Sequence, residues 1–184
     1  MSHKLMTIAL FGVVAALMFT GSPLSAAAHA EKASFKTEAL ARVDQLTERV
    51  VGLAEAIPAG KYSYKPMEGT RSIGEELMHI AGANYGTGRM IGTPPPEGFD
   101  FRAFGSSATE KSDIITKLKA SFKHFRGAVD AMDGGMPSKP TKIFGGQDST
   151  YRGATSALLG HLAEHFGKLI SNARASGVVP PWSE

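Results

Sequence analysis

The sequence contains no cysteine. This absence excludes disulfide bonds, a thiol nucleophile, thiolate metal ligands and a lipid-modified cysteine near the N-terminus. The N-terminal apolar run, residues 8–19, holds about a dozen residues, whereas a membrane-spanning helix needs about 20. The sequence also lacks internal repeats, low-complexity tracts and blocks of like charge, so nothing in it indicates a linker or a long disordered tail.

The charge is small and dispersed. The chain has 20 lysines and arginines against 17 aspartates and glutamates, a net charge of +3. A nucleic-acid-binding surface needs basic side chains concentrated in one patch or stripe. The basic residues here are scattered along the chain, so we expect no nucleic-acid partner.

Residues 1–30 have the features of a secretory signal peptide, in the usual order. Lys4 precedes the apolar run, Pro23 ends it, and Ala28-His29-Ala30 is a small-x-small cleavage site. We therefore expect residues 31–184 to form one mature domain that is periplasmic or secreted, with no stable membrane insertion after cleavage. Retention of the segment as an uncleaved anchor is the open alternative.

Apolar residues recur at spacings of three and four in four segments, a pattern typical of amphipathic helices. We predict helices over residues 35–57, 73–91 and 151–176, and another whose apolar positions run from Ile115 to Met132. No segment shows convincing strand alternation. The predicted fold class is therefore all-α, a four-helix bundle.

The ends of these helices carry recognisable signals. Ser72 and Glu75 form a capping box at the start of the second helix, and Gly177 follows the last one. The connecting segments are long, namely residues 58–72, 92–108 and 133–150. Because loops beyond about 12 residues are commonly functional or crossover connections, at least one of them could cross the bundle.

Six histidines are present, and position reduces the candidates for a site to three. His3 and His29 lie in the expected signal peptide. His124 lies opposite the apolar stripe of its helix, where we expect it to face water. His161 and His165 are one helical turn apart, about 6 Å along one side of the last helix, which suits two imidazoles that bind one cation.

His79 is the third candidate, because it lies on a second face of its helix, opposite Leu77 and Ile80. Each glycine in a helix costs about 1 kcal/mol relative to alanine, so something should pack or bind against a face that contains two of them. The small residues and methionine of that face are Gly82, Ala83, Gly86 and Met90.

We predict a three-histidine metal site formed by His79, His161 and His165. Three neutral imidazoles suit zinc, nickel, iron or copper, and the sequence does not choose among these divalent transition metals. Glu164 directly precedes the second histidine of the pair, so the HExxH arrangement of metalloproteases is absent. The alternative is that the histidines are hydrogen-bonded core residues in a helical interaction module.

Three motifs in a fixed order extend the argument to the whole chain. They are a Tyr-x-Tyr-Lys-Pro stretch at residues 62–66, the phrase RSIGEELMHIAGANYG at residues 71–86, and GHLAEHFGKLI at residues 160–170. In these the chain resembles the DinB-like superfamily, also described as DinB/YfiT-type metal-dependent hydrolases, over residues 36–181.

The resemblance implies a four-helix bundle with a long crossover between its second and third helices. It also implies a divalent metal held by His79, His161 and His165, with an open coordination position. Relatives characterised as enzymes include thiol-dependent transferases and an isomerase that use bacillithiol or mycothiol. Export argues against a cytosolic thiol cofactor, so hydrolysis of an unknown small molecule is favoured over thiol transfer.

Further candidates near the substrate are polar residues on the same helices and in the third connection. The alternative to a role near the substrate is structural for each of them. Asn84 is in phase with Leu77 and Ile80 and could be a hydrogen-bonded core amide, and Glu164 could be a solvated neighbour of the histidines. A buried acid or base in the cleft would favour an enzyme; a cleft lined only by the histidines and apolar groups would favour a non-catalytic metal- or ligand-binding or stress-response bundle. The candidates are Asn84, Tyr85, Arg89, Gln147 and Glu164.

The C-terminal tail, residues 177–182, cannot continue the last helix because it contains glycine and prolines, and it ends in the only tryptophan, Trp182. Two alternatives stay open. The tail folds back over a groove or a homodimer partner, or it frays.

Overall fold

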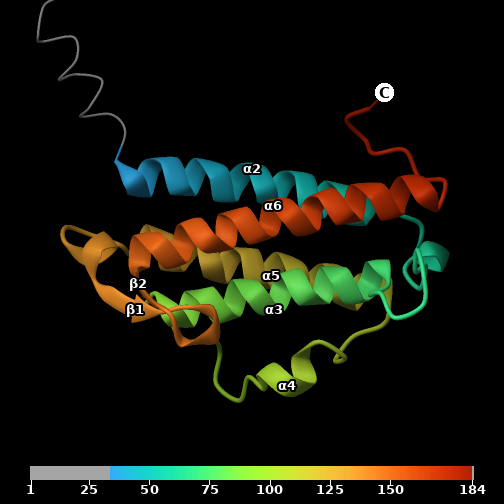
Figure 1. The fold of residues 1–184 in the computed structure, drawn as a ribbon. Helices are drawn as coiled ribbons and strands as arrows, with labels where there is room; N and C mark the ends of the chain where they lie inside the picture. The colour runs from blue at the N-terminus through green and yellow to red at the C-terminus, as the bar shows by residue number, and fades with distance from the viewer. Residues whose placement is uncertain (1–33, 184) are drawn as a thin grey trace, which may run out of the picture. The chain divides into compact units, whose positions relative to one another are not determined.

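A computed structural model describes residues 34–183. The expected signal peptide and its cleavage site lie outside these residues. Within them, the four long helices are α2 (Phe35–Ala56), α3 (Ile73–Met90), α5 (Lys111–Asp130) and α6 (Tyr151–Ala175) (Figure 1). The predicted four-helix bundle is confirmed, and the first, second and fourth helices each end one residue before the predicted boundary.

The helices are arranged so that α2 and α3 are both packed against α5 and α6. Helices α3 and α5 run in the same direction, because Gly74 near the start of α3 packs on Ile114 near the start of α5, and Gly88 near the end of α3 packs on His124. The chain must therefore return along the bundle between them. This return is the expected crossover, and it carries the short helix α4 (Phe101–Phe104) along the outside of α3 (Figure 1).

The start of α3 is fixed by the predicted capping box. The Ser72 hydroxyl accepts a hydrogen bond from the Glu75 amide at 3.2 Å, and the Glu75 carboxylate accepts one from the Ser72 amide at 2.6 Å. Both bonds satisfy amides that the first helical turn leaves without partners. The cap lies two turns before His79 and so sets the rotational phase in which that side chain faces its neighbours.

The third connection contains two short strands, although its sequence shows no strand alternation. Strands β1 (Pro140–Lys142) and β2 (Asp148–Thr150) form an antiparallel hairpin, with Gly145 and Gly146 at positive φ in its turn. Three-residue strands are too short to show alternation in a sequence. The Thr141 hydroxyl donates to the Met90 carbonyl at 2.7 Å, which ties the hairpin to the end of α3.

His124 does not face water as predicted. Its ring lies 4.9 Å from that of Tyr85 between centroids, and its Nε2 atom is buried. The reason is that α5 packs against α3 on a side beyond its own apolar stripe. Gly88 makes this approach possible, because a Cβ atom there would lie 2.5 Å from His124 Nε2.

We expect Gly88→Ala to lower the free energy of unfolding by about 1–3 kcal/mol, the usual cost of overpacking. Gly160→Ala is the matched control, because a Cβ at Gly160 has nothing within 4 Å and alanine favours the helix by about 0.5–1 kcal/mol. Urea unfolding of both variants measures the difference, and His124→Ala should relieve most of the loss. Equal stabilities of the two alanine variants would contradict close packing at Gly88.

The C-terminal tail folds back onto the bundle. The Trp182 ring lies 5.5 Å from that of Phe166 on α6, and the Arg49 guanidinium of α2 lies 5.7 Å from the Trp182 ring centroid.

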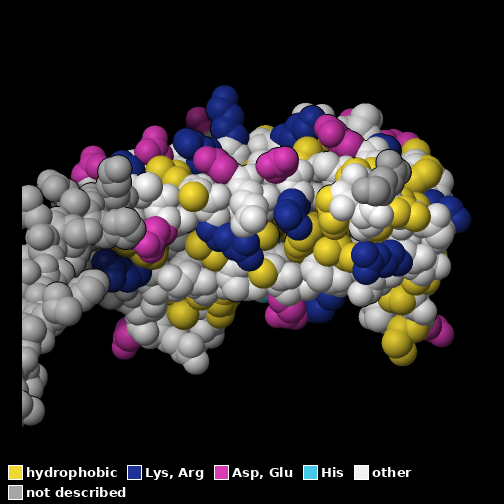
Figure 2. All heavy atoms as spheres, turned by 90° about the horizontal axis from the view of Figure 1, so that it is seen from above, with side chains coloured by type: hydrophobic (Ala, Val, Ile, Leu, Met, Phe, Trp, Pro, Cys, Tyr) yellow, Lys and Arg dark blue, Asp and Glu magenta, His cyan; other side chains and the backbone are white. Residues whose placement is uncertain are grey.

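Figure 2 shows the face formed by α2 and α6, on which acidic and basic side chains are interspersed. Among residues 34–183, no helix is long and apolar enough to cross a membrane.

Candidate metal centre

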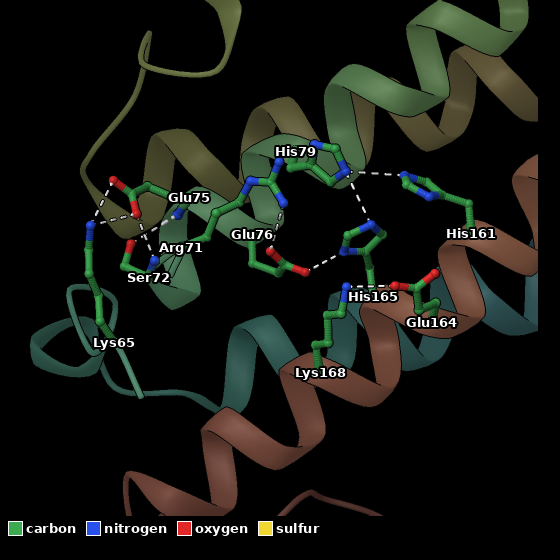
Figure 3. Close-up of polar contacts among 10 residues, drawn as sticks. All are labelled: Lys65, Arg71, Ser72, Glu75, Glu76, His79, His161, Glu164, His165 and Lys168. Atoms are coloured by element: carbon green, nitrogen blue, oxygen red, sulfur yellow. Dashed lines mark hydrogen bonds and ion pairs between the residues drawn. The ribbon is translucent and has the colours of Figure 1, made fainter. Parts of the chain in front are cut away.

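Three imidazoles meet where α3 packs against α6. His79 projects from α3, and His161 and His165 project from successive turns of α6, so that their rings point toward one another (Figure 3). The Nε2 atom of His79 lies 3.1 Å from that of His161 and 3.2 Å from that of His165. The three possible donor atoms all lie within 4.8 Å of one another.

These spacings fit a small divalent cation. Zinc–imidazole bonds of about 2.0–2.1 Å in tetrahedral geometry place neighbouring nitrogens roughly 3.3 Å apart. The two measured separations, 3.1 and 3.2 Å, are close to that edge length. A donor set of three imidazoles suits zinc, nickel, iron and copper, so the structure is compatible with each of these metals and selects none.

Burial keeps the imidazoles of His79 and His161 neutral. Burial, followed by the positive charge of Arg71, lowers the pKa of His79 to about 4, and burial is also the main cause that lowers the pKa of His161. His165 is almost completely buried, at 3% exposure. A neutral imidazole retains the lone pair that a metal needs, so no proton has to leave these two rings near neutral pH.

Glu76 orients one of the three rings, and the sequence analysis missed it. Its carboxylate is buried and accepts a hydrogen bond from Nδ1 of His165. With the proton on Nδ1, the lone pair of His165 is on Nε2, which faces the other histidines. Arg71 stands behind this carboxylate, with its Nη1 atom 3.6 Å from Glu76 Oε2 (Figure 3).

The lowered pKa of His79 predicts a pH-dependent stability of the metal-free protein. An unfolded histidine takes up a proton near pH 6.5, whereas folded His79 does so near pH 4. Between these values the unfolded chain binds more protons, so the free energy of unfolding should fall as the pH decreases from 6.5 to 4. Urea unfolding at several pH values measures this fall, which should be smaller in His79→Gln. Identical profiles would contradict a neutral, half-buried His79.

Two cavities with different linings meet at His79. One, of about 400 Å³, lies between the small residues of α3 and the aromatic rings of the crossover and the hairpin. The expectation that something packs against the small-residue face is thus confirmed, since Phe104 of α4 covers Gly82. The other cavity, of about 480 Å³, is polar and is lined by Lys65, Gly69, Thr70, Arg71, Glu75, His79 and Gly105.

The other candidate residues lie apart from these two cavities. Asn84 is fully buried and donates to the Ser121 hydroxyl at 3.1 Å, as a core amide does. Tyr85 is buried against Phe99, with ring centroids 4.6 Å apart.

Three further candidates are placed on the surface. Glu164 is exposed and pairs with Lys168 at 2.6 Å. Arg89 lies over the Phe101 ring at 4.9 Å from its centroid, and Gln147 is exposed in the hairpin. None of these three residues lines either of the two cavities at His79.

A sequence model of the DinB superfamily matches residues 42–169, which include all three histidines. The chain belongs to the DinB superfamily. Among solved structures, this DinB protein is similar to a DinB-like protein from Bacillus subtilis, with 20% sequence identity and a TM-score of 0.61. The match covers 77% of this chain and 93% of that one, and at this identity it supports the fold alone. No curated protein matches this DinB protein.

Proposed function

We propose that this DinB protein is an exported, metal-dependent hydrolase that binds one divalent transition metal through His79, His161 and His165. The observation that carries the proposal is the convergence of three Nε2 atoms beside two cavities. A cation held by three imidazoles with one position open lowers the pKa of a bound water or thiol and polarises a carbonyl.

The protein's own residues prepare the site for this chemistry. Glu76 holds His165 in the tautomer that binds metal, and burial keeps His79 neutral. Phe144 of the hairpin lies 5.9 Å from the His161 ring between centroids and limits the access of solvent from that side. The site is therefore preorganised by residues from α3, α6 and the hairpin, which is what a catalytic metal site requires.

Hydrolysis is preferred over thiol transfer because of the expected export. A signal peptide would direct the protein away from the cytosolic low-molecular-weight thiols that a transferase needs as co-substrate. Intact-mass measurement of protein recovered from outside the cytoplasm tests this premise, since cleavage after Ala30 should remove residues 1–30. Full-length protein found only in the cytosol would favour thiol transfer.

One observation supports a second candidate, a periplasmic metal- or ligand-binding protein without catalysis. The 400 Å³ cavity is lined by two of the histidines, by apolar or small residues and by Thr87, with no carboxylate among the described residues of its lining. A hydrolase usually has a general acid or base within reach of the reacting group. In this cavity a water molecule activated by the metal would have to react without help from a general acid or base.

Elemental analysis of protein purified without a metal-binding tag tests metal binding directly. We expect about one transition metal per chain. The loaded protein should then be screened against ester, amide and phosphoester substrates, and against thiol-transfer substrates, with the metal-free protein as control. Metal-dependent turnover would support the hydrolase, whereas bound metal without turnover would support the binding protein. Protein that neither contains metal nor takes up added zinc or nickel would contradict both.

A further inference from the structure

The two cavities beside His79 suggest what kind of molecule the site accepts. The apolar one extends along α3 from His79 to Thr87, which is eight residues of helix or about 12 Å. It is lined by Gly82 and Gly86 of α3 and by three aromatic rings. A Cβ at either glycine would already be in contact with a ring, at 3.7 Å from Phe104 and 3.8 Å from Phe101, so these rings pack directly on the glycines and the free space lies beside those contacts. This cavity has the dimensions of a ring or a short hydrocarbon chain.

The far end of this cavity is marked by Thr87, which is 1% exposed. Its hydroxyl makes no hydrogen bond within the described part of the chain, but it is buried too deeply for a molecule in the cavity to reach. Recognition at this end therefore rests on the apolar lining.

At the opposite end, in the polar cavity, Arg71 presents a guanidinium with unused donors. Among the described residues its one ion pair is with Glu76, at 3.6 Å, which is longer than a hydrogen bond. Figure 3 shows its side chain running along α3 toward His79. Lys65, the other cation of this cavity, is paired with Glu75 at 3.0 Å. Arg71 is therefore the cation best placed to bind an anionic group beside the histidines.

We propose that the site takes a small amphipathic carboxylic acid, with its carboxylate on Arg71 and its apolar body in the cavity lined by Phe101, Phe104 and Phe144. This rests on the proposed function, because the reacting group would then lie at the three histidines between the two ends. Arg71 acts here as a specificity-determining residue, and its contact with Glu76 holds the guanidinium in place.

Calorimetric titration of the zinc-loaded protein tests the proposal with three probes. These are 4-(4-hydroxyphenyl)butanoate, the corresponding neutral alcohol, and butanoate, which lacks the ring. We expect the first to bind about tenfold tighter than either of the others, the effect of one charge-assisted contact or of one buried ring. Zinc content is measured in every preparation, so that a failure of metal binding is recognised separately.

Three variants assign these preferences to the proposed residues. Arg71→Gln should remove the preference for the carboxylate over the alcohol, and Arg71→Lys should restore part of it. Gly86→Leu should fill the apolar cavity and reduce the first probe to the affinity of butanoate, and leucine favours the helix.

The outcomes separate the proposal from the proposed function. Normal zinc content with equal binding of acid and alcohol would overturn the assignment of Arg71 and leave metal binding intact. Retention of the carboxylate preference in Arg71→Gln would overturn it as well, because zinc itself would then be the anion's partner. Absence of zinc, with the preferences for the carboxylate and for the ring still present in the metal-free protein, would support the ligand class and contradict the hydrolase.

Discussion

Replacing His161 by alanine is expected to reduce the bound metal from about one per chain to nearly none. The three donor atoms lie within 4.8 Å of one another, so each contributes directly to a compact site. Loss of one imidazole leaves two ligands, too few for the three protein ligands of a typical catalytic metal site. Elemental analysis after dialysis measures the effect, and His79→Ala and His165→Ala should behave in the same way.

His124→Ala is the matched control for this prediction. It removes a half-buried histidine of the same bundle that lies against Tyr85 and Gly88 rather than in the cluster. We expect it to retain the metal. A metal content that falls equally in His124→Ala and His161→Ala would show that general loss of packing, rather than loss of a ligand, is responsible.

The same variants should differ in the stability that added metal confers. A ligand that binds only the folded state stabilises it by about 2.7 kcal/mol when its free concentration is about 100 times Kd. Zinc should therefore raise the unfolding midpoint of the parent protein and of His124→Ala, but not that of His161→Ala. An equal rise in all three proteins would place the metal somewhere other than the histidine cluster.

The helices and the three histidines could be predicted because both depend on local spacing. The start of α3 at a capping box and the single turn between His161 and His165 are properties of short segments, and the structure preserves them. The crossover between α3 and α5 was different, because it followed from the resemblance to the DinB family. Spacing within a helix does not determine which neighbours the helix has.

The predictions that failed concern contacts between distant segments. His124 was assigned to water from its phase on α5 alone, but Gly88 of α3 lets a second helix approach it. The hairpin β1–β2 has strands of three residues, and one hydrogen bond ties it to the end of α3, so no periodic pattern could reveal it.

Glu76 was overlooked although a signal was available. It lies three residues after Ile73 and three before His79, so an ionisable side chain falls on the buried part of α3. A charge in such a position needs a partner, and the partner is His165, 89 residues away in the sequence. The sequence could have raised the question, but only the packing of α3 on α6 identifies the partner.

This pairing leads to the second large expected effect. Glu76→Gln should weaken metal binding by about 10- to 100-fold, as loss of the carboxylate behind a histidine ligand usually does. Glutamine is neutral and holds the Nδ1 proton less firmly. If its amide group turns toward His165 instead, it places the proton on Nε2 and blocks the lone pair that faces His79 and His161. Competition with a chelator of known affinity, at fixed pH, measures the change.

Glu75→Gln, one residue away, provides the control. Glu75 is exposed and caps α3, so its loss should cost stability but leave metal affinity unchanged. Glu76→Ala, which keeps no acceptor, should bind metal more weakly than Glu76→Gln. At saturating metal both Glu76 variants should still take up about one ion per chain, unlike His161→Ala, because all three imidazoles remain. A Glu76→Gln protein with the parent's affinity would mean that the packing of α6 alone orients His165.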